Sequence, residues 1–134
     1  MGGDETMIVA GVGFRRNVDA DEIVALVEQA LARAAVAREA LDQLATVEAL
    51  AALSAFSEAA RRLAVTPISV AEQVLIAAAP RGSTHSARSM VAHGVGSVAE
   101  AAALAAGGPQ SELILERIAS ASATCALARR EIRS

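Results

Sequence analysis

The sequence contains no lysine, tryptophan or tyrosine, and among its 134 residues it has only two phenylalanines and one cysteine. With a single cysteine no internal disulfide can form, and the apolar neighbours of Cys125 predict a small, buried core residue. The scarcity of aromatic side chains excludes a platform for stacking bases, and the net charge of -3 argues against general nucleic-acid binding. We therefore expect no disulfide framework and no nucleic-acid partner.

Long apolar segments are also missing, although 54% of the residues are hydrophobic. Uncharged runs reach only 11 residues, well short of the ~20 needed to cross a bilayer. The first residues include Asp4 and Glu5, which do not fit the basic start and apolar core of a secretory signal. We expect a single-domain protein in the cytoplasm that has no membrane contact.

Hydrophobic periodicity in the first half of the chain predicts alternating strands and helices. A continuous apolar run over residues 7–14 is typical of a central strand buried on both faces. Apolar residues at helical spacing from Ile23 to Ala34 predict a core-facing helix, which Asp19 caps. Strands are expected at residues 7–14, 44–47 and 65–70, and helices at residues 19–35, 48–63 and 69–79. This alternation predicts a mainly parallel sheet. Pro67 favours an edge strand or the beginning of a strand, and Ser69 is expected to cap the last of these helices.

The second half begins its regular structure at Ser97, which forms a capping box with Glu100 at the start of an alanine-rich helix. Glycines and a proline at residues 107–109 end this helix. Two strands are expected next, at residues 113–118 and 124–128, close enough along the chain to pair antiparallel.

Together these elements predict an α/β fold, a single-domain three-layer α/β/α sandwich around a mostly parallel mixed sheet of about five strands. Residues 1–6 are expected to form a flexible N-terminal extension, and residues 7–134 the domain. The three arginines at positions 129, 130 and 133 are expected in a solvated, charged tail.

A glycine turn follows the first strand, with the sequence Gly11-Val12-Gly13-Phe14-Arg15-Arg16. It begins like a dinucleotide fingerprint, but arginine stands where the third glycine is needed. Ligands of open α/β sheets bind at this edge, so Arg15 or Arg16 could hold an anion. The alternative is that both arginines are solvated loop charges.

A second glycine-rich loop, His93-Gly94-Val95-Gly96, precedes the helix that begins at Ser97. Its glycines allow the backbone to approach a ligand closely, and the first turn of the helix offers N–H groups and a partial positive charge. The loop is therefore a candidate anion cradle. A tight loop that only leads into a buried helix is the alternative.

The most polar stretch of the chain, residues 80–90, adds hydroxyl groups and positive charge. It holds Arg81, Arg88 and His85 but no acidic residue, and Ser83 or Thr84 could cap a helix that runs through Val91. Such a region suits an anion with many carboxylates. A surface loop has the same composition, and because all 12 basic residues are arginine, a GC-rich genome could also explain their choice.

Residues suited to catalysis or metal binding are few. His85 and His93 are separated by eight positions, with no cysteine or acid nearby to complete a metal site, so we expect no metal. The Gly-x-Ser-x-Gly motif of a serine nucleophile does not occur. Either histidine could move a proton near neutral pH, and the alternative is a hydrogen-bonding surface residue.

Four pieces of the chain are distinctive in their order and spacing. They are Gly11-Val12-Gly13-Phe14-Arg15, Leu44-Ala45-Thr46, the segment from Gly96 to Leu104, and Ala123-Thr124-Cys125-Ala126-Leu127-Ala128. Together they resemble the CobE family of cobalamin biosynthesis, which is similar to the carboxy-terminal domain of CbiG. The resemblance runs from Met7 to about Leu127 and implies a compact α/β/α domain whose ligand is a polycarboxylate intermediate of corrin-ring synthesis.

The resemblance leaves the activity open. In full-length CbiG the family reaction opens a lactone on the cobalt-containing macrocycle and releases a two-carbon fragment. This chain resembles only the carboxy-terminal portion, so we do not expect that activity to transfer directly. The family often has a lysine and then a glutamate after the Ala-Thr piece, whereas Leu50 and Leu53 stand here, which argues against a polar or catalytic role at these positions.

Three hypotheses follow. The first is a cobalamin biosynthesis protein that binds a tetrapyrrole-derived corrin intermediate as a carrier or accessory protein, with no cofactor of its own. The second is an enzyme that modifies or hydrolyses a precorrin, with His85 or His93 moving a proton. The third is a docking module for another pathway enzyme, and a homodimer is compatible with each hypothesis. The expected ligand-binding residues are Gly11, Gly13, Phe14, Arg15, Ser83, His85, Arg88, Gly96 and Ser97.

Overall fold

The computed structural model describes residues 4–81 and 98–133. A five-stranded sheet with the order β3-β2-β1-β5-β4 forms the middle layer, and β1 (Asp4–Phe14) is its central strand. Strand β1 pairs in parallel with β2 (Leu41–Val47), and β2 pairs in parallel with β3 (Thr66–Val70). Strand β5 (Ala123–Arg133) runs antiparallel to both β1 and β4 (Glu112–Ala119). All strands except β5 therefore share one direction, which confirms the predicted mostly parallel, mixed sheet.

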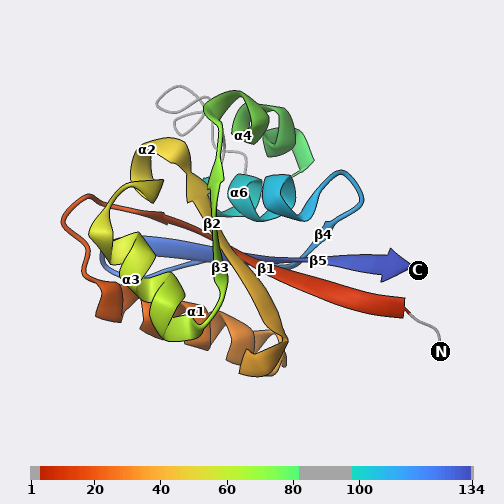
Figure 1. The fold of residues 1–134 in the computed structure, drawn as a ribbon, viewed down its shortest axis with the longest axis horizontal. Coiled ribbons are helices and arrows are strands. Elements are labelled where there is room, and N and C mark those ends of the chain that lie inside the picture. Colours follow the sequence, from red (N-terminus) through yellow and green to blue (C-terminus); the bar gives the residue numbers. More distant parts are fainter. Residues whose placement is uncertain (1–3, 82–97, 134) are drawn as a thin grey trace.

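Helices cover both faces of this sheet, as the three-layer prediction requires (Figure 1). On one face lie α1 (Ala20–Arg33) and α3 (Ser54–Leu63), and on the other lie α4 (Glu72–Ala78) and α6 (Val98–Gly107). The short helix α2 (Glu48–Ala51) follows β2, while the 3-10 turns η1 (Arg38–Ala40) and η2 (Ala79–Arg81) precede β2 and follow α4. The predicted α/β/α sandwich is thereby confirmed.

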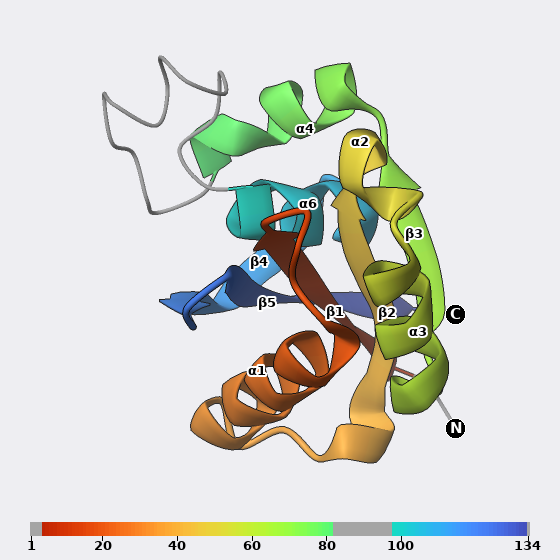
Figure 2. The ribbon, with the colours of Figure 1, turned by 90° about the vertical axis from the view of Figure 1, so that its left-hand side faces the viewer.

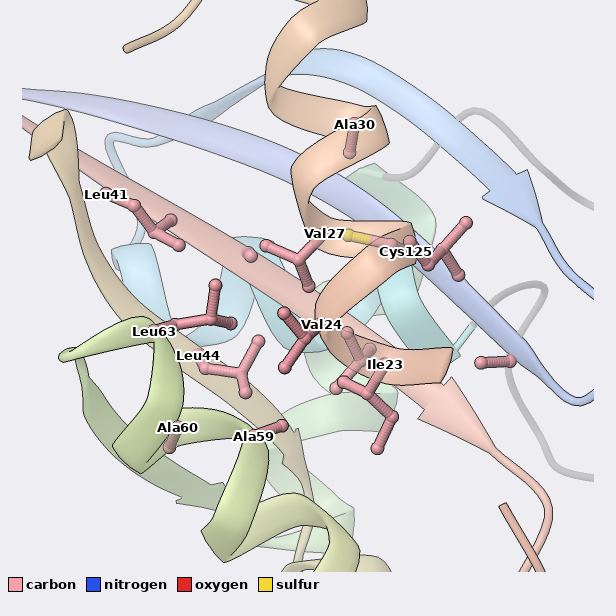
Figure 3. Packing of buried hydrophobic residues seen from close by; sticks show 14 of the residues in the cluster. Ile23, Val24, Val27, Ala30, Leu41, Leu44, Ala59, Ala60, Leu63 and Cys125 are labelled. Atoms are coloured by element: carbon pink, nitrogen blue, oxygen red, sulfur yellow. The ribbon is translucent and has the colours of Figure 1, made fainter. Parts of the chain in front are cut away.

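The larger hydrophobic core lies between the sheet and helices α1 and α3 (Figure 3). Ile23, Val27 and Leu31 of α1 are buried, as their helical spacing predicted. Leu44 of β2 and Leu63 of α3 complete this layer. Each large aliphatic side chain contributes roughly 1.5–3 kcal/mol when it leaves water, so this packing fixes α1 firmly against the sheet.

The opposite face of the sheet is covered closely by α6, whose sequence VAEAAALAAG is rich in alanine. A Cβ atom built on Gly11 would stand 2.1 Å from the carbonyl oxygen of Ala99 and 2.5 Å from the backbone nitrogen of Ala103. The helix backbone therefore rests directly on β1 at the point where the strand has no side chain. Glycine on the strand and alanine on the helix are what permits this contact.

Two polar side chains hold the carboxyl end of α6, where backbone carbonyls have no helical partner. Arg81 donates to the carbonyl oxygens of Gly108 and Ser111. The Ser111 hydroxyl donates to the carbonyl oxygen of Leu104 at 3.1 Å. A cation at this position also offsets the negative end of the helix dipole. Arg81, which the sequence placed in a positive ligand region, therefore serves the fold.

The sheet is longer at one end than the sequence predicted. Strand β1 begins at Asp4, and the pairing of Asp4 with Arg133 extends β5 to the same point. Residues 4–6 and 129–133, predicted as an extension and a solvated tail, are strand in the structure. Each of the two segments supplies the N–H and C=O partners of the other, which their charged sequences do not reveal.

Two helix predictions are wrong in detail. Residues 48–63 form α2 and α3 rather than one helix, with Leu53 extended between them (φ -74°, ψ 139°). Ser69 lies within β3 and does not cap α4, because the residue before that helix is Ala71. The first N–H of α4 instead faces the carboxylate of Glu48 at 3.4 Å. Both differences lie near the end of β2. Tertiary packing there overrides the local helix propensity of the residues.

Candidate functional site

The candidate site lies at the carboxyl ends of the parallel strands, the edge that faces the viewer in Figure 2. Helix α6 runs antiparallel to β1, since Val98 lies against Gly13 whereas Gly107 lies near Val9. Helix α1 begins at the same edge on the other face of the sheet and is capped by Asp19. Two helix N-termini, each with a partial positive charge, therefore flank the end of β1.

Two threonines anchor the end of β1 from its neighbouring strands. The hydroxyl of Thr46, which is fully buried, donates to the carbonyl oxygen of Val12 at 2.7 Å. The hydroxyl of Thr124 donates to the carbonyl oxygen of Gly13 at 3.3 Å. Both threonines belong to the distinctive motif pieces, so those pieces hold the strand end from which the β1–α1 loop departs.

Gly11 and Gly13, predicted to let a ligand approach, are both buried next to α6. A Cβ atom on Gly13 would stand 3.0 Å from the Thr124 Oγ1 atom and 3.3 Å from the Val98 Cβ atom. Contact with the α6 backbone thus accounts for the missing side chain at Gly11, whereas at Gly13 the space is limited by Thr124 of β5 and Val98 of α6. Direct ligand contact by either glycine stays a prediction.

The loop between β1 and α1 presents two arginines to solvent at this edge. Arg15 and Arg16 are exposed, and neither side chain has a hydrogen bond or ion pair within residues 4–81 and 98–133. The loop itself is fixed, because the Arg15 N–H donates to the carbonyl oxygen of Ser122 at 2.9 Å. Half-buried Phe14, just before it, stacks on Phe56 of α3 with ring centroids 6.2 Å apart. The guanidinium groups therefore extend from a well-held backbone and are available to a ligand.

Glu22 fastens the first turn of α1 to the turn between β4 and β5. Its carboxylate accepts hydrogen bonds from the Ser120 hydroxyl and, at 2.6 Å, from the N–H of Ser122. These bonds favour the charged carboxylate and hold the pKa of Glu22 below its ordinary value of 4.5. The expected capping role of Asp19 is confirmed, since Asp19 accepts the N–H of Glu22 at 3.2 Å.

Sequence reasoning missed the position of Arg117 and its link to Glu100. Glu100, in the first turn of α6, is 1% exposed, and its carboxylate accepts the backbone N–H of Arg117 at 3.0 Å. This bond ties the start of α6 to β4 beside the candidate site. Glu100 could have been singled out from the sequence as the acidic residue within an alanine-rich helix, although a capping role explains its presence equally well. Arg117 carried no signal, because the contact between β4 and α6 is a tertiary feature.

The other sequence-predicted residues lie outside the described ranges, and their roles stay predictions: Ser83, His85, Arg88, His93, Gly96 and Ser97. Leu50 and Leu53, at the positions where the family often has a lysine and a glutamate, are half-buried. Among the residues that the structure describes, no three His, Cys, Asp or Glu side chains gather in a way that could hold a metal ion. The helices in these ranges are all too short or too polar to cross a membrane.

A cavity of about 600 Å³ lies beside the β1–α1 loop, between α1 and α3. Its charged lining residues are Asp19, Glu58 and Arg61, and Arg61 is already paired with Glu58 at 2.5 Å. Two carboxylates against one guanidinium leave the lining negative, which disfavours a ligand with many carboxylates. We therefore place the candidate anion site at the exposed arginines rather than in this cavity.

The chain matches known proteins along nearly its whole length. Residues 8–128 match the family described as the cobalamin synthesis G C-terminus. Protein CobE from a Sinorhizobium species is 39% identical over 121 residues, which cover 90% of this chain and 79% of that protein.

Two crystal structures share the fold. CobE, a protein from the cobalamin (vitamin B12) biosynthetic pathway, superposes with a TM-score of 0.84 and 32% identity over 92% of this chain and 93% of that one. Cobalamin biosynthesis protein chiG from Agrobacterium tumefaciens superposes with a TM-score of 0.72 and 34% identity, over 90% of this chain and 96% of that one. The chain therefore belongs to the CobE/CbiG C-terminal family of cobalamin biosynthesis.

Proposed function

We propose that this protein binds a polycarboxylate corrin-ring intermediate at the carboxyl edge of β1 and acts as a carrier or accessory protein in cobalamin biosynthesis. The observation that carries the proposal is the pair of exposed arginines, Arg15 and Arg16, which lack side-chain partners within the described ranges. A free guanidinium group binds a carboxylate through two parallel hydrogen bonds. Family membership supports the pathway, and the arginines support a ligand with carboxylates.

The N-termini of α1 and α6 lie at the same edge as these arginines. Carboxylates in the first turn of each helix, Asp21 and Glu22 in α1 and Glu100 in α6, offset the partial positive charge of the helix ends, so the attraction for an anion rests on the two guanidinium groups. The nearby carboxylates are engaged elsewhere, since Asp19 caps α1 and Glu22 holds the β4–β5 turn. The whole chain is acidic, with a net charge of -3, so attraction must come from this local group and should weaken as salt is added.

A visible-absorbance and gel-filtration titration at low salt tests the proposal. The probes are the polycarboxylate corrin hydrogenobyrinic acid and its diamide, in which two carboxylates are neutral amides. We expect pigment to co-elute with the wild-type protein. Arg15→Gln should weaken binding about tenfold, since one lost charge-assisted pair costs ~1.4 kcal/mol. Arg33→Gln is the matched control, because Arg33 lies in the last turn of α1, far from this edge.

The alternative functions give different results in the same experiment. An enzyme would produce absorbance changes that continue after binding equilibrates, and substitution of His85 or His93 would reduce turnover far more than it weakens binding. A docking module would bind no pigment and would co-purify with another enzyme of the pathway. Absence of co-eluting pigment at low salt would refute the binding proposal.

A further inference from the structure

Most arginines with described side chains serve the fold. Each of these donates to a carboxylate or a backbone carbonyl oxygen of this chain: Arg38, Arg61, Arg62, Arg81, Arg129 and Arg130. Among the arginines whose side chains the structure describes, those with no such partner are Arg15, Arg16, Arg33 and Arg117. An arginine that does not hold the fold is available to hold something else.

Three of these four arginines lie around the candidate site. Arg33 is in the last turn of α1, at the far end of that helix. Arg15 and Arg16 follow the end of β1, and Arg117 lies near the end of β4, which runs in the same direction as β1. The backbone of Arg117 contacts the first turn of α6 through Glu100. Three of the four unpartnered arginines therefore lie at the edge where α1 and α6 begin.

The sheet sets the separation between these arginines. Strand β5 lies between β1 and β4, and its Cys125 pairs with Val12 on one side and Ile118 on the other. Two strand spacings place the backbones of β1 and β4 about 10 Å apart. Arg117 is exposed, and Glu116 beside it makes no ion pair with it in the described part of the chain. A flat ligand whose carboxylates are spread around its rim could meet both arginine positions at once.

We propose that Arg117 is a further ligand-binding residue of this edge, which takes a carboxylate on the opposite side of the ligand from the one held by Arg15. This inference rests on the proposed function and names a determinant of its specificity. Because Arg117 stands on a strand tied to α6, its position is fixed more precisely than that of a residue on a free loop. Two guanidinium groups at a set separation favour a ligand with several separated carboxylates over a ligand with one.

The test is the same pigment titration with Arg117→Gln, beside Arg15→Gln and the control Arg33→Gln. We expect Arg117→Gln to weaken binding of hydrogenobyrinic acid about tenfold, and Arg33→Gln to leave binding unchanged. The double variant of Arg15 and Arg117 should bind more weakly than either single variant, because each arginine holds a different carboxylate of the same ligand. Arg117→Lys keeps the charge but loses the bidentate geometry, so it should weaken binding by a smaller factor.

The outcomes separate this inference from the proposed function. If Arg15→Gln weakens binding while Arg117→Gln and Arg117→Lys bind like wild type, the role of Arg117 is refuted and the proposed function stands. Equal weakening by Arg117→Gln and Arg33→Gln would show an effect of net charge alone and would also refute it. If wild type binds no pigment, both proposals fall. Matching urea midpoints for wild type and Arg117→Lys exclude unfolding as the cause of weaker binding.

Discussion

Replacing Gly11 with alanine tests the contact that holds α6 on the sheet. The new Cβ atom would stand 2.1 Å from the carbonyl oxygen of Ala99, whereas unstrained carbon–oxygen contacts lie near ~3.3 Å, so the helix must retreat by about 1 Å. A gap of this size forfeits up to about half of the dispersion energy of the atoms that lose contact. Overpacking of this kind lowers the free energy of unfolding by about 3 kcal/mol. Alanine also restricts the unfolded chain more than glycine does, which raises the free energy of unfolding by about 0.5 kcal/mol.

Urea unfolding measures the expected net loss, which is about 2.5 kcal/mol in the free energy of unfolding. This is a large share of the ~5–15 kcal/mol that stabilises a typical domain. With a slope near 2 kcal/mol per molar urea, the midpoint of Gly11→Ala should fall by about 1.2 M. Gly13→Ala is the milder comparison, because its Cβ atom would meet Thr124 Oγ1 at 3.0 Å and Val98 Cβ at 3.3 Å, contacts that a shift of a few tenths of an ångström relieves. A Gly11→Ala midpoint equal to that of wild type would refute the reasoning. Loss of pigment binding without loss of stability would instead support the predicted ligand contact at Gly11.

Two further predictions concern titratable groups. The pKa of Glu22 is lowered from 4.5 by its bonds from Ser120 and Ser122, so its carboxylate stabilises the fold above pH 4.5 and loses this effect as the pH falls through the lowered pKa. The urea midpoints of wild type and Glu22→Gln should therefore differ most near neutral pH and converge in acid, and a gap independent of pH would contradict this. Burial raises the pKa of the Cys125 thiol to about 12, so a disulfide reagent at about pH 8 should modify it only as the protein unfolds. Rapid modification without urea would show that the thiol is accessible.

Hydrophobic patterning was sufficient to predict the main elements. The apolar run at residues 7–14 marked the central strand, and the spacing of Ile23, Val27 and Leu31 marked the buried face of α1. The prediction of an edge strand from Pro67 is confirmed by the place of β3 in the sheet. These predictions work because burial on one or both faces leaves a period in the sequence that belongs to one kind of element.

Boundaries and caps were less predictable. The break between α2 and α3 at Leu53 and the loss of the Ser69 cap leave no distinct local pattern, since alanine-rich segments favour helix throughout. The charged residues at 129–133 were predicted to form a tail because their pairing depends on β1, which lies more than a hundred positions away in the sequence. Local propensity cannot reveal a partner that lies so far along the chain.

By itself the sequence determined the α/β fold class, the central strand and the family, and it placed Arg15 and Arg16 directly after that strand, because hydrophobic periodicity and the order of motifs can be read along the chain. The tertiary structure alone decided that Gly11 lies beneath α6, that Arg81 holds the end of that helix, and that Arg117 stands beside its beginning. Each of these roles depends on which distant segments meet. A backbone contact or a hydrogen bond between residues that are far apart in the sequence imposes no repeating pattern on the residues around it.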